Sequence, residues 1–350
     1  MTDEEIKKAL EDVDNYEQAV NACLTFIHIY RWDDAKNRPD NEVLHCIGKL
    51  YTPGDVTPDI TLQLSTIRGL VVELKRSFPQ NSEIKDYWKD NFDELKKYDV
   101  QLVGWETPNK KVNQQELILI VDQKFTRKII DYIEKNKIFF TDFSKNFCLV
   151  QYSPASGLAP GVFIRAEYGK IDDFKTKTTK SLSEGITVKL IHLLTTGLSQ
   201  TKFLDYKPPI IYLMSTLWDH VFNTLPTAED WRSYNTENSR KHILLTVTSS
   251  KLREFLSRNF ADKNSSRGLK EEWIKEALEN FVKLKLAERG KITGEYIIKY
   301  RKKIADEHDD ANKHHVFAEL LYKSGVQVPL GDFENDKNGK SASTTAHKHT

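Results

Sequence analysis

Apolar and polar positions follow two different periods in the first third of the chain. Spacings of three and four residues predict amphipathic helices, whereas strict alternation or short apolar runs predict strands. The segments with helical spacing are 3–32, 42–51 and 83–97. The segments with strand character are 60–64, 70–75, 100–105 and 116–121, with a turn near 66–69. This mixture of elements predicts an α/β domain.

The same two patterns continue into the middle of the chain. Residues 126–136 are predicted to form a helix, and residues 148–152 and 162–168 are predicted to form strands. Residues 170–183 are rich in Lys and Thr and show little periodicity. We therefore place the end of the first domain at residue 170, so that this domain covers residues 1–170.

The second half of the chain is predicted to be mainly helical. Helical spacing is present at 186–198, at 208–225, at 251–260, and in a longer segment that follows the loop 264–268 and ends near residue 289. Residues 291–301 have the pattern of a hairpin. We assign residues 171–330 to a second domain, and we expect the polar tail 331–350 to be disordered.

Composition narrows the class of protein. A chain of 350 residues with 39% hydrophobic and 29% charged residues is typical of a globular protein with two domains. The formal net charge of +1 excludes a uniformly basic surface but is compatible with a local basic face. Three widely spaced cysteines, Cys23, Cys46 and Cys148, form neither a zinc motif nor a disulfide framework. Without a long apolar run or a signal peptide, we expect no membrane contact and a cytoplasmic location.

Two carboxylates and a lysine lie on the two short strands that follow residue 57. Asp59 opens the first strand, and Glu73 and Lys75 lie at the end of the second. Because side chains alternate between the faces of a strand, Glu73 and Lys75 point to the same side. Two carboxylates can bind a hard divalent cation, and a nearby lysine can orient a water or stabilise negative charge. This combination predicts metal-assisted hydrolysis of a phosphodiester.

The arrangement Pro58-Asp59, a spacer, and Glu73-x-Lys75 after an apolar run resembles the signature of the PD-(D/E)xK nuclease superfamily. The resemblance implies a restriction-endonuclease-like fold, which is a mixed sheet flanked by helices. It also implies that Mg²⁺ or Mn²⁺ is bound by Asp59, Glu73 and the backbone carbonyl of Leu74. Lys75 would then be the third catalytic residue beside Asp59 and Glu73.

The resemblance covers roughly residues 14–130 and suggests one further ligand. Some members of the superfamily bring a glutamate from the first helical region to the metal, which makes Glu42 a candidate and Glu17 an alternative. The expected order of helix, strand, strand, helix and strand is present in the pattern. The additional strand that usually precedes the motif is short or absent in this pattern.

Two residues on the helix after Lys75 concern the subfamily. RecB-like nucleases carry Gln-x-x-x-Tyr at this place, whereas this chain has Glu94 and Tyr98. Since only the tyrosine matches, the subfamily stays open, and we interpret Tyr98 as a residue that packs at the helix end. Asp122, which ends a predicted strand, is interpreted as a cap or turn residue and not as a metal ligand.

Basic residues cluster in the last third of the chain, where helix, loop, helix and hairpin together resemble a winged helix-turn-helix. Such clusters bind nucleic acids by displacing counterions from phosphates. The candidates for nucleic-acid binding are Arg267, Lys270, Lys299 and Arg301. Glutamates lie among them, so a mixed solvated face remains an alternative interpretation.

Together these patterns predict an Mg²⁺- or Mn²⁺-dependent nuclease of the restriction, phage-defence or repair type. DNA is the expected substrate, RNA is an alternative, and a homodimer is compatible with the sequence. Two other functions remain open. One is a catalytically inactive nuclease fold that binds DNA or serves in assembly. The other is a winged-helix regulator in which the motif is a coincidence, and this requires little sheet in residues 55–125.

Overall fold

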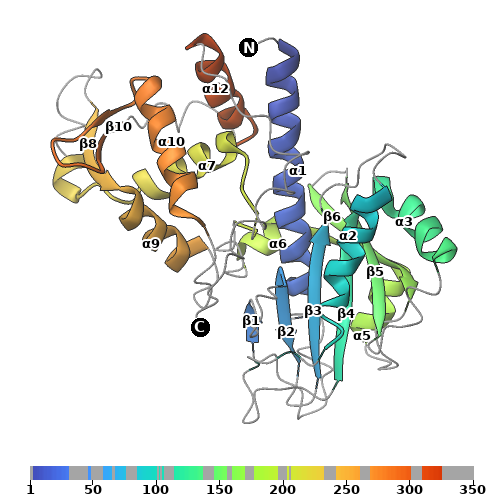
Figure 1. Ribbon diagram of the computed structural model, residues 1–350. Helices are drawn as coiled ribbons and strands as arrows, with labels where there is room; N and C mark the ends of the chain where they lie inside the picture. Colours follow the sequence, from blue (N-terminus) through green and yellow to red (C-terminus); the bar gives the residue numbers. More distant parts are fainter. Residues whose placement is uncertain are drawn as a thin grey trace, which may run out of the picture. The chain divides into compact units, whose positions relative to one another are not determined.

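The computed structural model describes residues 3–30, 46–48, 58–64, 68–75, 85–100, 102, 105, 114–136, 146–155, 160–169, 177–195, 203–204, 206–231, 242–260, 269–300 and 310–324. The chain divides into two compact units, and Figure 1 labels most of their helices and strands. The sheet unit comprises residues 15–206 and 256–269. The C-terminal unit comprises residues 1–14, 207–255 and 270–350.

A seven-stranded mixed sheet forms the centre of the sheet unit, with its strands in sequence order from β1 to β7. Strands β3, β4 and β5 pair in parallel, and the remaining neighbours pair antiparallel. The strands are β1 Cys46–Gly48, β2 Ile60–Gln63, β3 Arg68–Lys75, β4 Gln114–Asp122, β5 Phe147–Ala155, β6 Gly161–Gly169 and β7 Ile186–Lys189. The predicted α/β class with a mixed sheet is therefore confirmed.

Two helices of this unit match the predicted helices 83–97 and 126–136, whereas one at 177–184 lies almost wholly in the segment 170–183, for which no helix was predicted. The helices of the unit are α1 Asp3–His28, which begins in the C-terminal unit, α2 Lys85–Lys96, α3 Gln123–Lys135, α5 Lys177–Glu184 and α6 Leu190–Thr195. Both α2 and α3 cover the same face of the sheet, because Phe92 and Leu95 of α2 share a buried cluster with Ile129 and Ile133 of α3. The sheet contributes alternate residues to this cluster, namely Val71, Leu117, Leu119, Val121 and Leu149.

Strand β3 is buried on both faces from its first residue to Leu74. Its first residue is a charged one: Arg68 forms an ion pair with Glu116 of β4 at 3.6 Å, and the two side chains are 2% and 3% exposed. A buried charge of this kind persists only when it is paired, because leaving it alone costs several kcal/mol, roughly 3–5 in measured cases. The strand is therefore held to β4 by charge as well as by the ladder.

Two of the predicted helices are wrong in part, and both errors concern the edges of the sheet. The structure describes residues 46–48 of the predicted helix 42–51, and they form β1, which pairs with β2. The predicted helix 186–198 begins instead with β7, in which Val188 lies opposite Val162 of β6. A neighbouring strand outweighs helical spacing in such short apolar runs. The sheet consequently extends past residue 170, the predicted end of the first domain.

The predicted strand 100–105 is also wrong, because Val100, Leu102 and Trp105 lie outside any strand. The side chain of Gln115, buried on β4, binds backbone groups of this segment instead. Its Oε1 accepts from Leu102 N–H at 3.0 Å, and its Nε2 donates to the carbonyls of Tyr98 and Val100 at 2.6 and 2.9 Å. One glutamine therefore binds three backbone groups of the segment after α2.

The predicted turn near 66–69 ends earlier than expected, since Arg68 and Gly69 already belong to β3. Gly69 lies directly beneath the ring of Trp105. A Cβ atom added at this position would come within 2.5 Å of the indole. The absence of a side chain at Gly69 thus makes room for a large buried aromatic residue above the strand.

The C-terminal unit combines helices with a small antiparallel sheet of order β8-β10-β9. Its elements are α7 Ile210–Thr216, the π-helix η3 Leu217–Phe222, β8 Ile243–Thr248, the first part of α9 Ser249–Phe260, α10 Glu271–Lys283, β9 Ala287–Arg289, β10 Glu295–Tyr300 and α12 Asp310–Lys323. Residues 256–260 of α9 belong to the sheet unit. The predicted helices at 208–225 and 251–260 are present. The helix predicted to end near residue 289 ends at Lys283, and the hairpin begins at Ala287. Strand β8 was not predicted.

Aromatic rings hold this unit together around Trp218 of η3. Its ring lies 5.3–6.0 Å from the rings of Phe222, Phe281, Tyr300 and Phe317. These rings come from α10, β10 and α12 as well as from η3, so a single side chain joins the sheet to three helices.

None of the helices within the described ranges is both long and apolar enough to cross a membrane. The predicted disordered tail 331–350 lies outside those ranges.

We expect Gln115→Leu to destabilise the protein by about 2–4 kcal/mol, because buried backbone groups that lose their partners cost roughly 1–3 kcal/mol each. Urea denaturation of the purified variant measures this loss. Gln114→Leu is the matched control, since Gln114 is the exposed neighbour on the same strand. Equal unfolding free energies for the two variants would show that the Gln115 contacts add no stability.

Candidate functional site

The predicted same-face arrangement of Glu73 and Lys75 is present at the end of β3. Val71 of this strand faces the core under α2 and α3, and Glu73 and Lys75 follow it at intervals of two residues. Lys75 Nζ donates to Glu73 Oε1 at 2.8 Å. Lys75 lies beside Val121 of β4, so the pair occupies the edge of the sheet where the parallel strands end.

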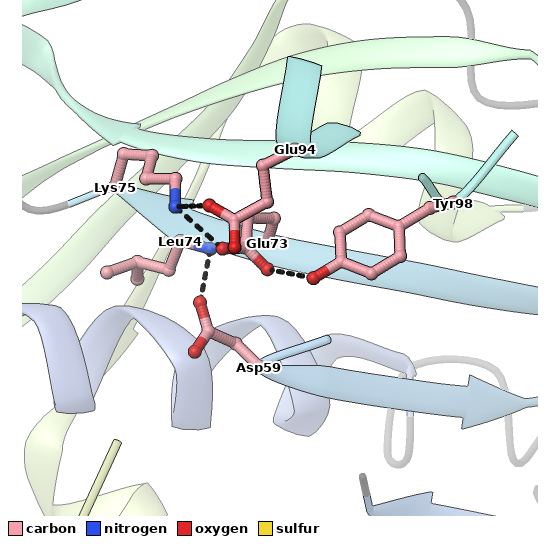
Figure 2. A network of polar contacts seen from close by, with 6 residues as sticks. All are labelled: Asp59, Glu73, Leu74, Lys75, Glu94 and Tyr98. Atoms are coloured by element: carbon pink, nitrogen blue, oxygen red, sulfur yellow. Dashed lines mark hydrogen bonds and ion pairs between the residues drawn. The ribbon is translucent and has the colours of Figure 1, made fainter. Parts of the chain in front are cut away.

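Asp59 reaches the same place from the residue directly before β2. Ile60 lies opposite Val72 in the antiparallel pairing, so one step further along brings Asp59 beside Glu73. Asp59 Oδ2 accepts from the backbone N–H of Leu74 at 2.7 Å, and the aspartate is buried. Figure 2 shows the three predicted catalytic residues gathered around this bond.

The region of α2 adds two more residues to the cluster. Glu94 Oε2 accepts from Lys75 Nζ at 2.7 Å, and the hydroxyl of Tyr98 donates to Glu73 Oε2 at 3.0 Å (Figure 2). Tyr98 packs in the core at the end of α2 as predicted, and its hydrogen bond to Glu73 is an additional contact that was not predicted. The four-residue spacing of Glu94 and Tyr98 was the available signal, because it places both side chains on one side of a helix.

Burial and the carboxylates of the cluster together raise the pKa values of Lys75 and Tyr98. Burial by itself would lower the pKa of Lys75, but Glu73 and Glu94 outweigh it and raise this pKa well above 10.5. Burial, followed by the neighbouring carboxylates of Glu73, Glu94 and Asp59, raises the pKa of Tyr98. Lys75 therefore remains an ammonium ion and Tyr98 remains a neutral donor at physiological pH.

The cluster has more negative than positive charge. Asp59, Glu73 and Glu94 contribute three carboxylates against the one ammonium of Lys75, which gives a formal charge of −2. The Glu94 side chain is 27% exposed, the Lys75 side chain 17% and the Glu73 side chain 8%, so solvent reaches the cluster from the α2 side. Such a site attracts a cation and can offer it hard oxygen ligands.

The cluster contains oxygen ligands, but the described residues form no closed metal cage. Among the residues that the structure describes, no three His, Cys, Asp or Glu side chains are placed as a metal cage. Mg²⁺ commonly needs only one or two carboxylates, because water and substrate phosphates complete its shell. Each carboxylate oxygen has a second lone pair, so the hydrogen bonds to Asp59 and Glu73 leave capacity for a cation.

The remaining candidates near the site have different outcomes. Glu42 lies outside the described residues, and Glu17 is an exposed residue of α1. The backbone N–H of Leu74 bonds to Asp59, which brings the carboxylate next to this peptide, whereas metal binding by its carbonyl stays a prediction. Asp122 caps α3 by accepting from Lys124 N–H at 2.8 Å, so its interpretation as a cap is confirmed.

Of the predicted nucleic-acid-binding residues, two are described and two are not. Arg267 and Arg301 lie outside the described residues. Lys270 is exposed just before α10, with its ammonium 5.4 Å from the centre of the Trp273 ring. Lys299 forms an ion pair with Glu288 across the β9–β10 hairpin. This pairing reduces the positive charge that Lys299 presents.

Comparisons with known proteins add no assignment. No protein-family model, no curated protein and no solved structure matches this chain. The geometry of the cluster and the short motif around it are therefore the features of this chain that point to a function.

We expect Tyr98→Phe to lower the free energy of unfolding by about 1.5–3 kcal/mol, the usual range for a hydrogen bond to a charged group. The ring stays in place and only the donor to Glu73 is lost. Tyr168→Phe is the matched control, because Tyr168 packs at the edge of the same core. Urea denaturation compares the two variants. If both variants lost the same free energy of unfolding, the hydrogen bond to Glu73 would add no stability of its own.

Proposed function

We propose that this protein is a metal-dependent nuclease of the PD-(D/E)xK type that hydrolyses phosphodiester bonds in DNA. The convergence of Asp59, Glu73 and Lys75 at one edge of a mixed sheet is the observation that carries the proposal. Asp59 lies 14 positions before Glu73 and 16 before Lys75, yet the fold joins the two groups through the peptide of Leu74.

The order of elements around the cluster supports a restriction-endonuclease-like fold. Helix α1 is followed by the antiparallel strands β1, β2 and β3, then by α2 and by β4 parallel to β3. The short strand β1 stands where the superfamily has a strand before its motif. The alternative in which the motif is a coincidence requires little sheet in residues 55–125, whereas β2, β3 and β4 all lie there.

In this proposal Asp59 and Glu73, with the carbonyl of Leu74, hold Mg²⁺ or Mn²⁺. Such a cation, when bound, polarises a phosphate oxygen and lowers the pKa of a bound water. Lys75 acts as an ammonium ion, because Glu73 and Glu94 hold its pKa well above the ordinary value. It therefore donates hydrogen bonds to a water or to a phosphate oxygen and stabilises the charge that develops there. It does not serve as a general base.

The C-terminal unit supports a second part of the proposal, which is DNA binding by a winged-helix-like domain. Helices α9 and α10 precede the β9–β10 hairpin, and β8 lies beside β10 in the sheet. Several acidic side chains of α10 bind within the unit: Glu271 accepts from Ser249, Glu276 pairs with Lys207, and Glu279 pairs with Arg289. These contacts reduce the negative charge that α10 would present to a phosphate.

Lys75→Met is expected to lower the rate of DNA cleavage by about a hundredfold or more, the loss typical of removing one group that stabilises transition-state charge. Supercoiled and linear DNA, each with and without Mg²⁺, are suitable substrates. Lys135→Met removes an exposed lysine from α3 and is the control. Unchanged cleavage by Lys75→Met would contradict the proposed role of the lysine. A parent protein that cleaves no DNA under any of these conditions would favour the inactive-nuclease alternative.

Asp59→Asn and Glu73→Gln are each expected to weaken Mn²⁺ binding by at least about tenfold, because each variant removes one negative oxygen donor from a hard-cation site. Calorimetry in the absence of DNA measures the affinity. Asp122→Asn is the control, since Asp122 is a buried carboxylate at the end of the next strand and serves as a cap. If Asp122→Asn alone weakened binding, the cation site would lie elsewhere.

Lys270→Glu is expected to weaken DNA binding and to lower the slope of log affinity against log salt by about 1–2, since roughly one phosphate contact is lost and a repulsive charge is added. Mn²⁺ binding should not change. Fluorescence anisotropy at several salt concentrations measures the slope, and Lys135→Glu in the other unit serves as control. If Lys270→Glu had the same slope as the parent, Lys270 would make no contact with a DNA phosphate.

A further inference from the structure

Glu94 has a position that the three-residue motif does not explain. It comes from α2, one layer away from the sheet, and its carboxylate lies 2.7 Å from Lys75 Nζ. The same ammonium lies 2.8 Å from Glu73 Oε1. Lys75 thus bridges two carboxylates from different elements, and Figure 2 shows the ammonium between them.

Under the proposed function, Glu73 must bind both the divalent cation and the Lys75 ammonium. A cation bound by Glu73 competes with Lys75 for the electron pairs of the same carboxylate, since both are positive and both need its oxygens. If Glu73 were the only carboxylate near Lys75, binding the cation would leave a largely buried ammonium with a weakened partner. Leaving a buried charge poorly paired is costly.

Glu94 removes this conflict, because it offers Lys75 a carboxylate outside the motif. The Glu94 side chain is more exposed than that of Glu73, at 27% against 8%. Tyr98 meanwhile donates to the other oxygen of Glu73 and keeps that carboxylate oriented. The two residues, one turn apart, therefore act on the two ends of the Lys75–Glu73 pair.

We propose that Glu94 is a positioning residue that holds the Lys75 ammonium and thereby frees Glu73 to bind a divalent cation. This inference rests on the proposed function. Glu94 then acts on the cation through Lys75 and not as a ligand. Partners of metal ligands typically affect metal affinity by about 10–100-fold.

Mn²⁺ binding measured by calorimetry without DNA tests the inference in two backgrounds. In the parent protein, we expect Glu94→Leu to weaken binding by about tenfold or more. Glu94→Gln keeps an oxygen that accepts from Lys75, so we expect it to restore part of the affinity. In the Lys75→Met background, Glu94→Leu should have a clearly smaller effect, because there is no ammonium left to hold.

Two controls separate this role from folding and from net charge. Circular dichroism and urea denaturation establish that each variant is folded. Asp93→Asn removes a negative charge from the neighbouring position of the same helix, so it measures the effect of charge alone. We expect Asp93→Asn to change Mn²⁺ affinity much less than Glu94→Leu does.

The outcomes distinguish this inference from the function on which it rests. If Glu94→Leu weakens Mn²⁺ binding equally in both backgrounds, Glu94 acts on the cation directly and the positioning role is wrong. If Glu94→Leu binds Mn²⁺ as the parent does, the inference also fails, while the proposed nuclease function stands. A parent protein that binds no Mn²⁺ and cleaves no DNA overturns both.

Discussion

Burial of β3 on both faces is the constraint on which the sheet unit depends. A strand between two other strands, with a helical layer over one face, has no access to water along most of its length. Every charge that it carries must therefore find a partner inside the protein. Arg68 finds Glu116 on β4 at one end. At the other end Lys75 finds Glu73 and Glu94.

The two ends of β3 meet this constraint in different ways, and the difference separates a structural ion pair from a candidate site. Arg68 and Glu116 balance each other and are closed to solvent. The cluster at Lys75 contains three carboxylates for one ammonium and is open on the α2 side. A closed and balanced pair has no excess charge to attract an ion, whereas a partly exposed cluster with excess negative charge can still take up a cation.

The turn after α2 links the fold to this cluster. Gln115 binds the backbone of Tyr98, Val100 and Leu102, and Tyr98 in turn donates to Glu73. A side chain on β4 thus sets the position of a residue that orients a carboxylate on β3. The C-terminal unit has a core of its own, in which the ring of Trp218 lies at the centre of an aromatic cluster. Its proposed role in DNA binding needs only an exposed surface, and Lys270 provides part of one.

The sequence alone predicted the elements that depend on residues close to each other along the chain. The apolar alternation of β3 and β4, the helical spacing of α2 and α3, and the same-face placement of Glu73 and Lys75 all depend on residues within a few positions of each other. The cap at Asp122 is local in the same sense, because it satisfies an amide two residues away.

Only the tertiary structure decided the features that depend on a distant partner. The edge strands β1 and β7 exist because β2 and β6 offer them a ladder, and helical spacing in a short run does not reveal that partner. The turn 98–102 is not a strand because Gln115, more than ten residues away, takes up its backbone groups. Glu94 and Tyr98 join the cluster because α2 packs over the end of β3. The four-residue spacing of Glu94 and Tyr98 predicts that they share one side of a helix, but only the packing of that helix on the sheet brings them to Lys75 and Glu73.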